Sequence, residues 1–134
     1  MKGITKNLNT WGVRWSNMTS ARIGLEIENG KILAIRCLQD GEPSRVGKVL
    51  LERFRSVDSV WSLLIGGDVS TIRTHSKRIH DISLLGKPNY AALYDHVEHY
   101  QVQAGQEPYL YVMRCDGLWY VSQQGNSFVP LVSK

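Results

Sequence analysis

The sequence predicts an α+β fold, in which an antiparallel sheet of four to six strands carries two or three helices packed mainly on one face. Two dipeptides, Asn29-Gly30 and Asp116-Gly117, each separate β-like segments and are typical of hairpin turns. Between these hairpins, residues 44–65 place apolar side chains at helical spacing. Antiparallel hairpins at both ends and helices between them indicate this class of fold.

A chain of 134 residues, 43% of them hydrophobic, is long enough to bury one core, so we expect a single domain over residues 1–134. Near its start, Trp11, Val13 and Trp15 alternate on one face of an expected edge strand, and we expect the tryptophans to dock on the core. No apolar run approaches the roughly 18 residues of a membrane span. No secretory signal pattern is present, so we expect a protein of the host-cell cytoplasm.

Residues 21–38 predict a hairpin in which apolar side chains at Ile23, Leu25 and Ile27 alternate with other residues. A two-residue turn at Asn29-Gly30 would pair Ile27 with Ile32 and set positions 23, 25 and 27 beside 32, 34 and 36. The returning strand, 32–38, is apolar on both faces apart from one arginine, which predicts an interior strand covered on both sides.

Two helices are predicted next. Ser44 is the expected N-cap of a helix that runs to about Phe54, and Gly47 within it indicates close packing against the sheet. A second helix begins at Ser56 or Asp58 and ends at a glycine pair. Its predicted apolar face comprises Val57, Val60, Trp61, Leu64 and Ile65.

The last third predicts a helix from Tyr90 to about Gln103 that is capped by Asn89. Its expected buried face contains Tyr90, Leu93, Tyr94 and Val97. A strand over 109–114, a two-residue turn at Asp116-Gly117 and a strand over 118–122 follow. A final strand within 127–132 is expected at an edge of the sheet, because Pro130 cannot donate a ladder hydrogen bond.

The chain is basic, with a formal net charge of +4 and a pI of about 9.2. This charge allows attraction to nucleic acid, to nucleotides or to an acidic protein. The densest basic cluster lies in a segment, 68–89, that we expect to be irregular, and a solvated surface loop is the alternative interpretation. We predict a partner-binding or anion-binding surface on this cluster and on the exposed face of the first helix: Arg73, His75, Lys77, Arg78 and His80, with Arg45, Lys48 and Arg55.

The motifs of catalytic and metal sites are missing from the sequence, so we predict no catalytic residue, no metal and no cofactor. His96 and His99 share a predicted helix face without a metal-site pattern around them. Cys37 and Cys115 are expected to be reduced thiols. A turn and a helix start explain Asp40 and Glu42. Enzyme activity therefore remains a minor alternative, with Cys37, Asp40 and Glu42 as its residues.

The central stretch resembles a family of small, mostly uncharacterised phage and prophage proteins. The family pattern has a strand that ends in Cys, then Asp-Gly-x-Pro, Val-Gly, a Leu-Leu helix and Gly-Asp-x-Ser. The matching residues are Cys37, Asp40-Gly41-Glu42-Pro43, Val46-Gly47-Lys48, Leu50-Leu51-Glu52 and Gly67-Asp68-Val69-Ser70, with an aromatic strand pair over 109–121. Family members often carry His-Trp after the Cys and Tyr before the Pro, where this chain has Leu38-Gln39 and Glu42.

This resemblance implies an accessory protein of a mobile element that acts against host immunity. We therefore predict a non-enzymatic, anti-CRISPR-like inhibitor that binds a host defence protein or ribonucleoprotein complex through its basic surface. One alternative is a sponge that sequesters a cyclic nucleotide of an anti-phage system, with tyrosines that stack on bases and an oligomer or a deep pocket. Another is a small RNA- or DNA-binding module. A homo-oligomer stays open.

Overall fold

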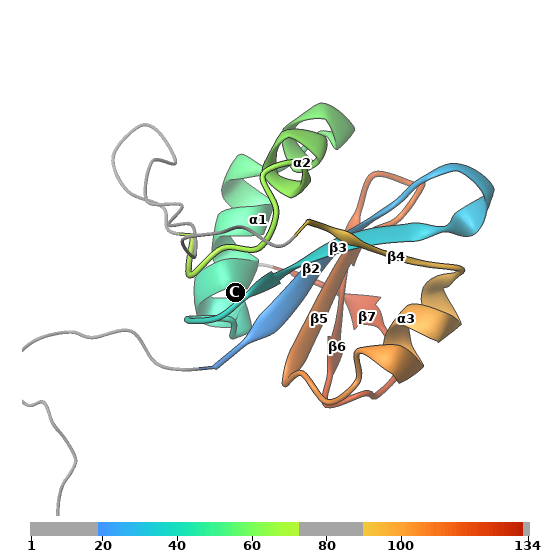
Figure 1. The fold of residues 1–134 in the computed structure, drawn as a ribbon. Coiled ribbons are helices and arrows are strands. Elements are labelled where there is room, and N and C mark those ends of the chain that lie inside the picture. The colour runs from blue at the N-terminus through green and yellow to red at the C-terminus, as the bar shows by residue number, and fades with distance from the viewer. Residues whose placement is uncertain (1–18, 73–89, 133–134) are drawn as a thin grey trace, which may run out of the picture.

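The computed structural model describes residues 19–72 and 90–132. These form a six-stranded sheet in the order β4-β3-β2-β5-β6-β7 (Figure 1). The strands are β2 (Ala21–Glu26), β3 (Ile32–Cys37), β4 (Ala92–Tyr94), β5 (Tyr109–Met113), β6 (Trp119–Gln123) and β7 (Val129–Pro130). The helical elements are η1 (Glu28–Gly30), η2 (Pro43–Gly47), α1 (Lys48–Arg53), α2 (Val57–Leu64) and α3 (Val97–Gln103).

The predicted α+β class is confirmed, and all strand pairs are antiparallel except β2 with β5. Helices α1 and α2 cover one face of the sheet, and α3 packs on the other (Figure 1). Alternation along each strand divides the side chains between these faces. On β2, for example, Ile23 and Leu25 point to the α1/α2 face, whereas Arg22 points to the α3 face. A Cβ on Gly24 would also lie on the α3 face.

The first hairpin has the predicted turn residues but a different register. Asn29 and Gly30 have φ of 63° and 76°, and the Lys31 N–H donates to the Glu28 carbonyl at 3.3 Å. The Ile27 N–H, however, donates to the Lys31 carbonyl at 2.7 Å, so Ile27 and Glu28 both face Lys31. This extra residue is a bulge. The predicted pairing of 27 with 32 was therefore wrong, and Ile23 pairs with Ile35.

Strand β3 lies between β2 and β4, as predicted for an interior strand. The helix after it starts earlier than expected: a π-helical turn begins at Pro43 and leads into α1, and Ser44 is not its N-cap. Proline suits this first position, because its fixed φ is already helical and the missing N–H would have had no partner. A Cβ on Gly47 would lie 3.3 Å from Leu131 Cδ1 and 3.6 Å from Tyr111 Cε1, which confirms its close packing.

Helix α2 begins as predicted. Ser56 and Ser59 form a capping box, in which the Ser59 N–H donates to Ser56 Oγ at 3.1 Å. Gly67, with φ of 84°, ends the helical turn. The predicted apolar face was wrong in part: Val60 and Leu64 are buried as predicted, and so is Leu63, which was not predicted. Three other predicted members, Val57, Trp61 and Ile65, are 53%, 45% and 62% exposed.

The predicted helix from Tyr90 was also wrong in its first half. Residues 92–94 form β4, which pairs with β3 through Ile32 and Tyr94, and α3 starts only at Val97. The side chain of His96, not Asn89, accepts the capping bond. Tyr90 is 84% exposed and Leu93 is 54% exposed. Pairing with β3 is a tertiary interaction that overrides the local helical pattern.

The second hairpin, β5–β6, matches the predicted strands but has a three-residue loop. Met113 pairs with Trp119, and the Arg114 N–H donates to the Leu118 carbonyl. Gly117 takes φ of 79° at the last loop position, as three-residue hairpins require. Strand β7, with Pro130, lies at the edge, as predicted. The N-terminal prediction for Trp11, Val13 and Trp15 lies outside the described residues. None of the helices in ranges 19–72 and 90–132 has the length and apolarity needed to span a membrane.

Candidate functional site

The predicted basic surface divides into a described and an undescribed part. The cluster Arg73, His75, Lys77, Arg78 and His80 lies outside the described residues. Three of the predicted cations are exposed: Arg45 on η2, Lys48 on α1 and Arg55 in the link between α1 and α2. Arg45 Nε lies 3.8 Å from the Glu42 carboxylate, and both partners of this ion pair reach solvent. The exposed face of the first helix is therefore basic, but carboxylates of Glu42 and Glu52 are interspersed.

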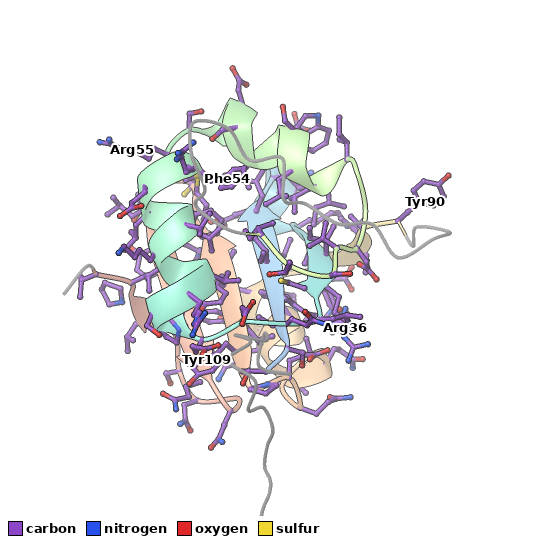
Figure 2. All side chains as sticks on the ribbon, turned by 90° about the vertical axis from the view of Figure 1, so that its left-hand side faces the viewer. Arg36, Phe54, Arg55, Tyr90 and Tyr109 are labelled. Carbon is purple, nitrogen blue, oxygen red and sulfur yellow. The ribbon has the colours of Figure 1, made fainter. Side chains whose placement is uncertain are left out.

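These three cations are spread along the helix. Arg45 and Lys48 are three residues apart, which makes them neighbours on the helix surface. Arg55 lies beyond the other end of α1, about 15 Å from Arg45 if each residue adds the helical rise of 1.5 Å. Figure 2 shows Arg55 at the junction of α1 and α2, directed outward. The arrangement suits an extended partner surface better than one small anion.

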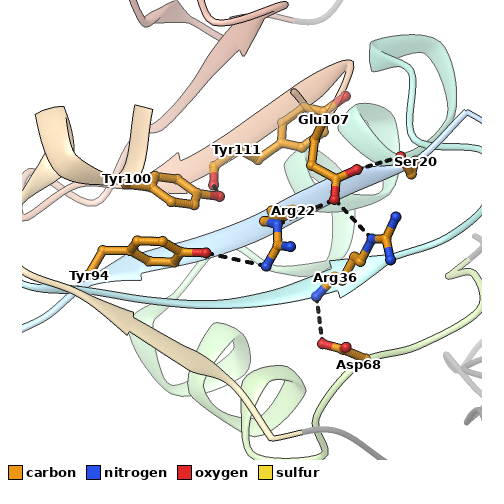
Figure 3. A network of polar contacts seen from close by, with 8 residues as sticks. All are labelled: Ser20, Arg22, Arg36, Asp68, Tyr94, Tyr100, Glu107 and Tyr111. Atoms are coloured by element: carbon orange, nitrogen blue, oxygen red, sulfur yellow. Dashed lines mark hydrogen bonds and ion pairs between the residues drawn. The ribbon is translucent and has the colours of Figure 1, made fainter. Parts of the chain in front are cut away.

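A polar network on the α3 face was not predicted from the sequence. Its centre is the buried Glu107, whose carboxylate forms ion pairs with Arg22 Nε at 3.4 Å and Arg36 Nε at 2.9 Å (Figure 3). The Ser20 hydroxyl donates to the other carboxylate oxygen of Glu107. Arg22 also donates to the Tyr94 hydroxyl at 3.3 Å. The network joins β2, β3, β4 and the segment before β5.

Strand register explains why a carboxylate is needed there. Arg22 and Arg36 are direct cross-strand partners on β2 and β3, and like charges in this position are destabilising. Glu107 approaches both guanidinium groups and offsets this repulsion. Arg36 remains 44% exposed and Arg22 25% exposed, whereas the Glu107 side chain is 6% exposed. The cluster links three strands, and the Arg36 N–H also donates to Asp68 Oδ1 at 2.8 Å (Figure 3).

A second ion pair lies at the opposite end of the same strands. Arg114 Nε lies 2.8 Å from Glu26 Oε1, and the Cys115 N–H donates to the same oxygen at 2.9 Å. Burial alone would raise the pKa of Glu26, but these hydrogen bonds and the charge of Arg114 outweigh burial and lower the pKa. The pKa of Arg114 is raised by the same hydrogen bond.

Two residues of the enzyme alternative, Cys37 and Asp40, are buried. Cys37 is fully buried, and burial raises the pKa of its thiol to about 11, so the thiolate form needed for nucleophilic attack is disfavoured. Asp40 is buried with φ of 61°, and it accepts a hydrogen bond from the Thr71 hydroxyl at 3.3 Å. A Cβ on Gly41 would lie 2.8 Å from Ala21 Cβ, which indicates a tightly packed turn.

His96 and His99 accept backbone hydrogen bonds at the start of α3. His96 Nδ1 accepts from the His99 N–H at 3.2 Å, and His99 Nδ1 accepts from the Asp95 N–H at 3.0 Å. His96 Nδ1 also lies 3.1 Å from the Glu98 carboxylate. Each ring therefore has one nitrogen committed to a backbone contact. Within the described residues, no group of three or more His, Cys, Asp and Glu could hold a metal ion.

Two of the tyrosines proposed to stack on bases are inaccessible to a base. Tyr100 and Tyr111 are fully buried on opposite faces of the sheet. The Tyr100 hydroxyl donates to the Tyr111 carbonyl at 3.0 Å, and the Tyr111 hydroxyl donates to the Gly41 carbonyl at 2.6 Å. Burial raises the pKa of both phenols well above the ordinary value. Both phenol groups therefore stabilise the fold.

The chain was also compared with protein-family models, curated proteins and solved structures. None of these comparisons produced a match.

Proposed function

We propose that this chain is a non-enzymatic binding protein that blocks a partner by covering an acidic surface on it. The observation that carries the proposal is the basic outer side of the first helical segment, where Arg45 on η2, Lys48 on α1 and Arg55 just after α1 reach solvent. Cations in such positions steer an acidic partner and orient it on the surface. The resemblance to phage proteins suggests the class of partner, a protein or ribonucleoprotein complex of host defence.

The chemistry of the described residues supports binding over catalysis. Cys37 is buried with a raised pKa, and Glu107 is held by two arginines. A catalytic site needs a nucleophile or base that a substrate can reach. Cys37 and Asp40 are buried instead, and the Tyr111 hydroxyl donates to the Gly41 carbonyl beside Asp40. Arg45, Lys48 and Arg55, by contrast, are exposed to solvent.

Affinity capture from the host cell with a charge-reversed bait tests the proposal. The variant carries Arg45→Glu, Lys48→Glu and Arg55→Glu, and the wild-type chain is the reference. We expect the wild type to retain a multi-subunit complex and the variant to lose it. The melting temperatures should agree within a few degrees, because exposed substitutions away from caps and cores change stability by less than about 0.5 kcal/mol.

Lys31→Glu is the matched control, since Lys31 is a partly exposed cation on the distant first hairpin that pairs with the exposed Asp95 at 3.8 Å. This control should capture the complex as the wild type does. Equal capture by the wild type and the α1 variant would exclude α1 as the binding surface.

A second variant, with Arg73, Lys77 and Arg78 changed to Glu, tests the other half of the predicted basic surface in the same assay. Loss of capture in this variant alone would move the binding surface from α1 to residues 73–78. If the bait were recovered without a protein complex but with a bound nucleotide, the result would contradict the blocking function and support the nucleotide sponge.

A further inference from the structure

Three apolar side chains form an exposed stripe along α2. Val57, Trp61 and Ile65 are 53%, 45% and 62% exposed, and they follow one another at four-residue intervals. Residues four apart lie on the same side of a helix. The buried side chains Val60, Leu63 and Leu64 face the sheet, so this α2 stripe flanks the side that already packs. Residues at this spacing are the usual anchors of helix-to-helix contacts.

We propose that the α2 stripe is the contact surface of a homodimer, in which α2 packs antiparallel on α2 of a second copy. The stripe is self-complementary, because its central Trp61 has one aliphatic residue four positions before it and one four positions after it. A two-fold axis through Trp61 would therefore place Trp61 on its own counterpart and Val57 on Ile65 of the second copy. Such an isologous contact needs no other surface.

Charge complementarity at the ends of α2 supports the antiparallel arrangement. The last turn of α2 contains no basic residue, so the described helix does not compensate its own negative C-terminal end. Arg55 directly precedes the start of the same helix and points outward (Figure 2). In an antiparallel pair, Arg55 of each copy comes near the C-terminal end of the other α2, and the acidic Asp58, three residues after Arg55, offsets part of this attraction. A parallel pair would instead bring the two Arg55 side chains together.

The size of the stripe determines the strength of the dimer. Val57 and Trp61 on the eight-residue helix, with Ile65 at its C-cap, form an interface well below the roughly 1,600 Å² of a standard stable complex. The dimer is therefore weak and concentration-dependent, with a dissociation constant of about 10 μM or above. Dimerisation would present two copies of Arg45 and Lys48 to one partner complex, which raises the avidity without any new contact, whereas Arg55 lies at the dimer contact.

Sedimentation equilibrium of the full chain, from micromolar to millimolar concentration, tests the dimer without any partner. We expect a reversible monomer–dimer equilibrium whose dissociation constant rises at least tenfold, roughly the effect of a central hot-spot residue, in Trp61→Lys. Val102→Lys is the matched control, because Val102 is 76% exposed on α3, on the opposite face of the sheet. This control should dimerise as the wild type does. A chain that stays monomeric at all concentrations, or a dimer that Trp61→Lys leaves intact, would overturn the proposal.

Cysteine cross-linking tests the orientation. The exposed Cys115 is first replaced by serine, and Val57→Cys and Ile65→Cys chains are then mixed and oxidised. We expect disulfides between position 57 of one chain and position 65 of the other to exceed those between like positions. An excess of like pairs contradicts the antiparallel arrangement. A separate chain carries both Val13→Cys and Val57→Cys. A disulfide between these two positions within one chain would show that the N-terminal segment covers the α2 stripe, and it would also overturn the dimer.

Discussion

The two faces of the sheet are held by different interactions. On the α1/α2 face, buried side chains from α1, α2 and four strands form one apolar cluster that includes Leu50, Leu64 and Met113. On the α3 face, a smaller cluster of six residues around Tyr100 occupies the middle. Ion pairs stand at both ends of that cluster, Glu107 with two arginines at one end and Glu26 with Arg114 at the other.

This difference shows how a short helix can cover a sheet face. Helix α3 has seven residues, and Tyr100 is its one fully buried side chain. It cannot cover the full length of β2 and β5, so charged side chains complete the face on either side of it. The ion pairs need precise partners, whereas the apolar cluster needs only volume and shape. The α1/α2 face should therefore be sensitive to cavities and the α3 face to charge and pH.

The largest effect is expected on the α1/α2 face. Leu64→Ala should lower the free energy of unfolding by about 3 kcal/mol, because Leu64 is fully buried and its removal leaves a cavity. Urea denaturation measures this loss. Val102→Ala, at an exposed position of α3, should be nearly neutral. A loss below about 1 kcal/mol for Leu64→Ala would mean that α2 is not part of the core.

The next effect concerns the charge cluster on the α3 face. Glu107→Gln should lower the free energy of unfolding by about 2 kcal/mol, less than a fully buried pair, because Arg22 and Arg36 are partly exposed. Urea denaturation at neutral pH gives the value. Glu98→Gln is the control, since its side chain is 76% exposed. Equal stability of the two variants would show that the ion pairs of Glu107 do not stabilise the α3 face.

Tyr100→Phe should have a smaller effect. The phenol donates its buried hydrogen bond to the Tyr111 carbonyl at 3.0 Å, and removal of such a donor destabilises by about 1 kcal/mol. Thermal denaturation, with Tyr90→Phe at an 84% exposed position as the reference, resolves the difference. If Tyr100→Phe melted with the reference, the α3 face would be held by its apolar atoms and ion pairs alone.

The smallest effect is a pH dependence. The pKa of Glu26 is lowered in the folded protein, so its carboxylate stabilises the fold at pH values above its ordinary pKa of 4.5. This contribution is lost as the pH falls through that value toward the lower folded pKa. Glu26→Gln should therefore be less stable than the wild type at pH 7, and the gap should narrow below pH 4.5. Urea titrations at several pH values measure the gap; a constant gap would indicate a packing role.

Local signals account for the parts of the fold that were predicted correctly. Asn29-Gly30, Ser56 and Pro130 each act through the backbone of their own neighbourhood, so their roles were visible in the sequence. The register of the first hairpin was not visible, because one hydrogen bond from Ile27 decides it. The start of α3 depends on residues 92–94 pairing with β3, which is a contact between distant segments.

The candidate site shows the same limit. Arg45, Lys48 and Arg55 were recognised because an amphipathic helix exposes its charged side. Glu107 was missed because Ser20 and its other partners lie more than 70 residues away in sequence. The exposure of Trp61 depends on the rotation of α2 about its own axis relative to the sheet. A helical periodicity that includes Val57, Val60 and Leu64 does not specify this rotation.

The parallel pairing of β2 with β5 has a consequence for the order of folding. The two halves of the sheet, β4-β3-β2 and β5-β6-β7, meet only at this seam. Residues that meet across the seam, such as Glu26 and Arg114, are 88 positions apart. Contacts of this separation are late and slow to form, and such topologies typically fold in milliseconds to seconds. On the ribosome, the first hairpin must therefore wait with one edge unpaired until the chain beyond Met113 has emerged.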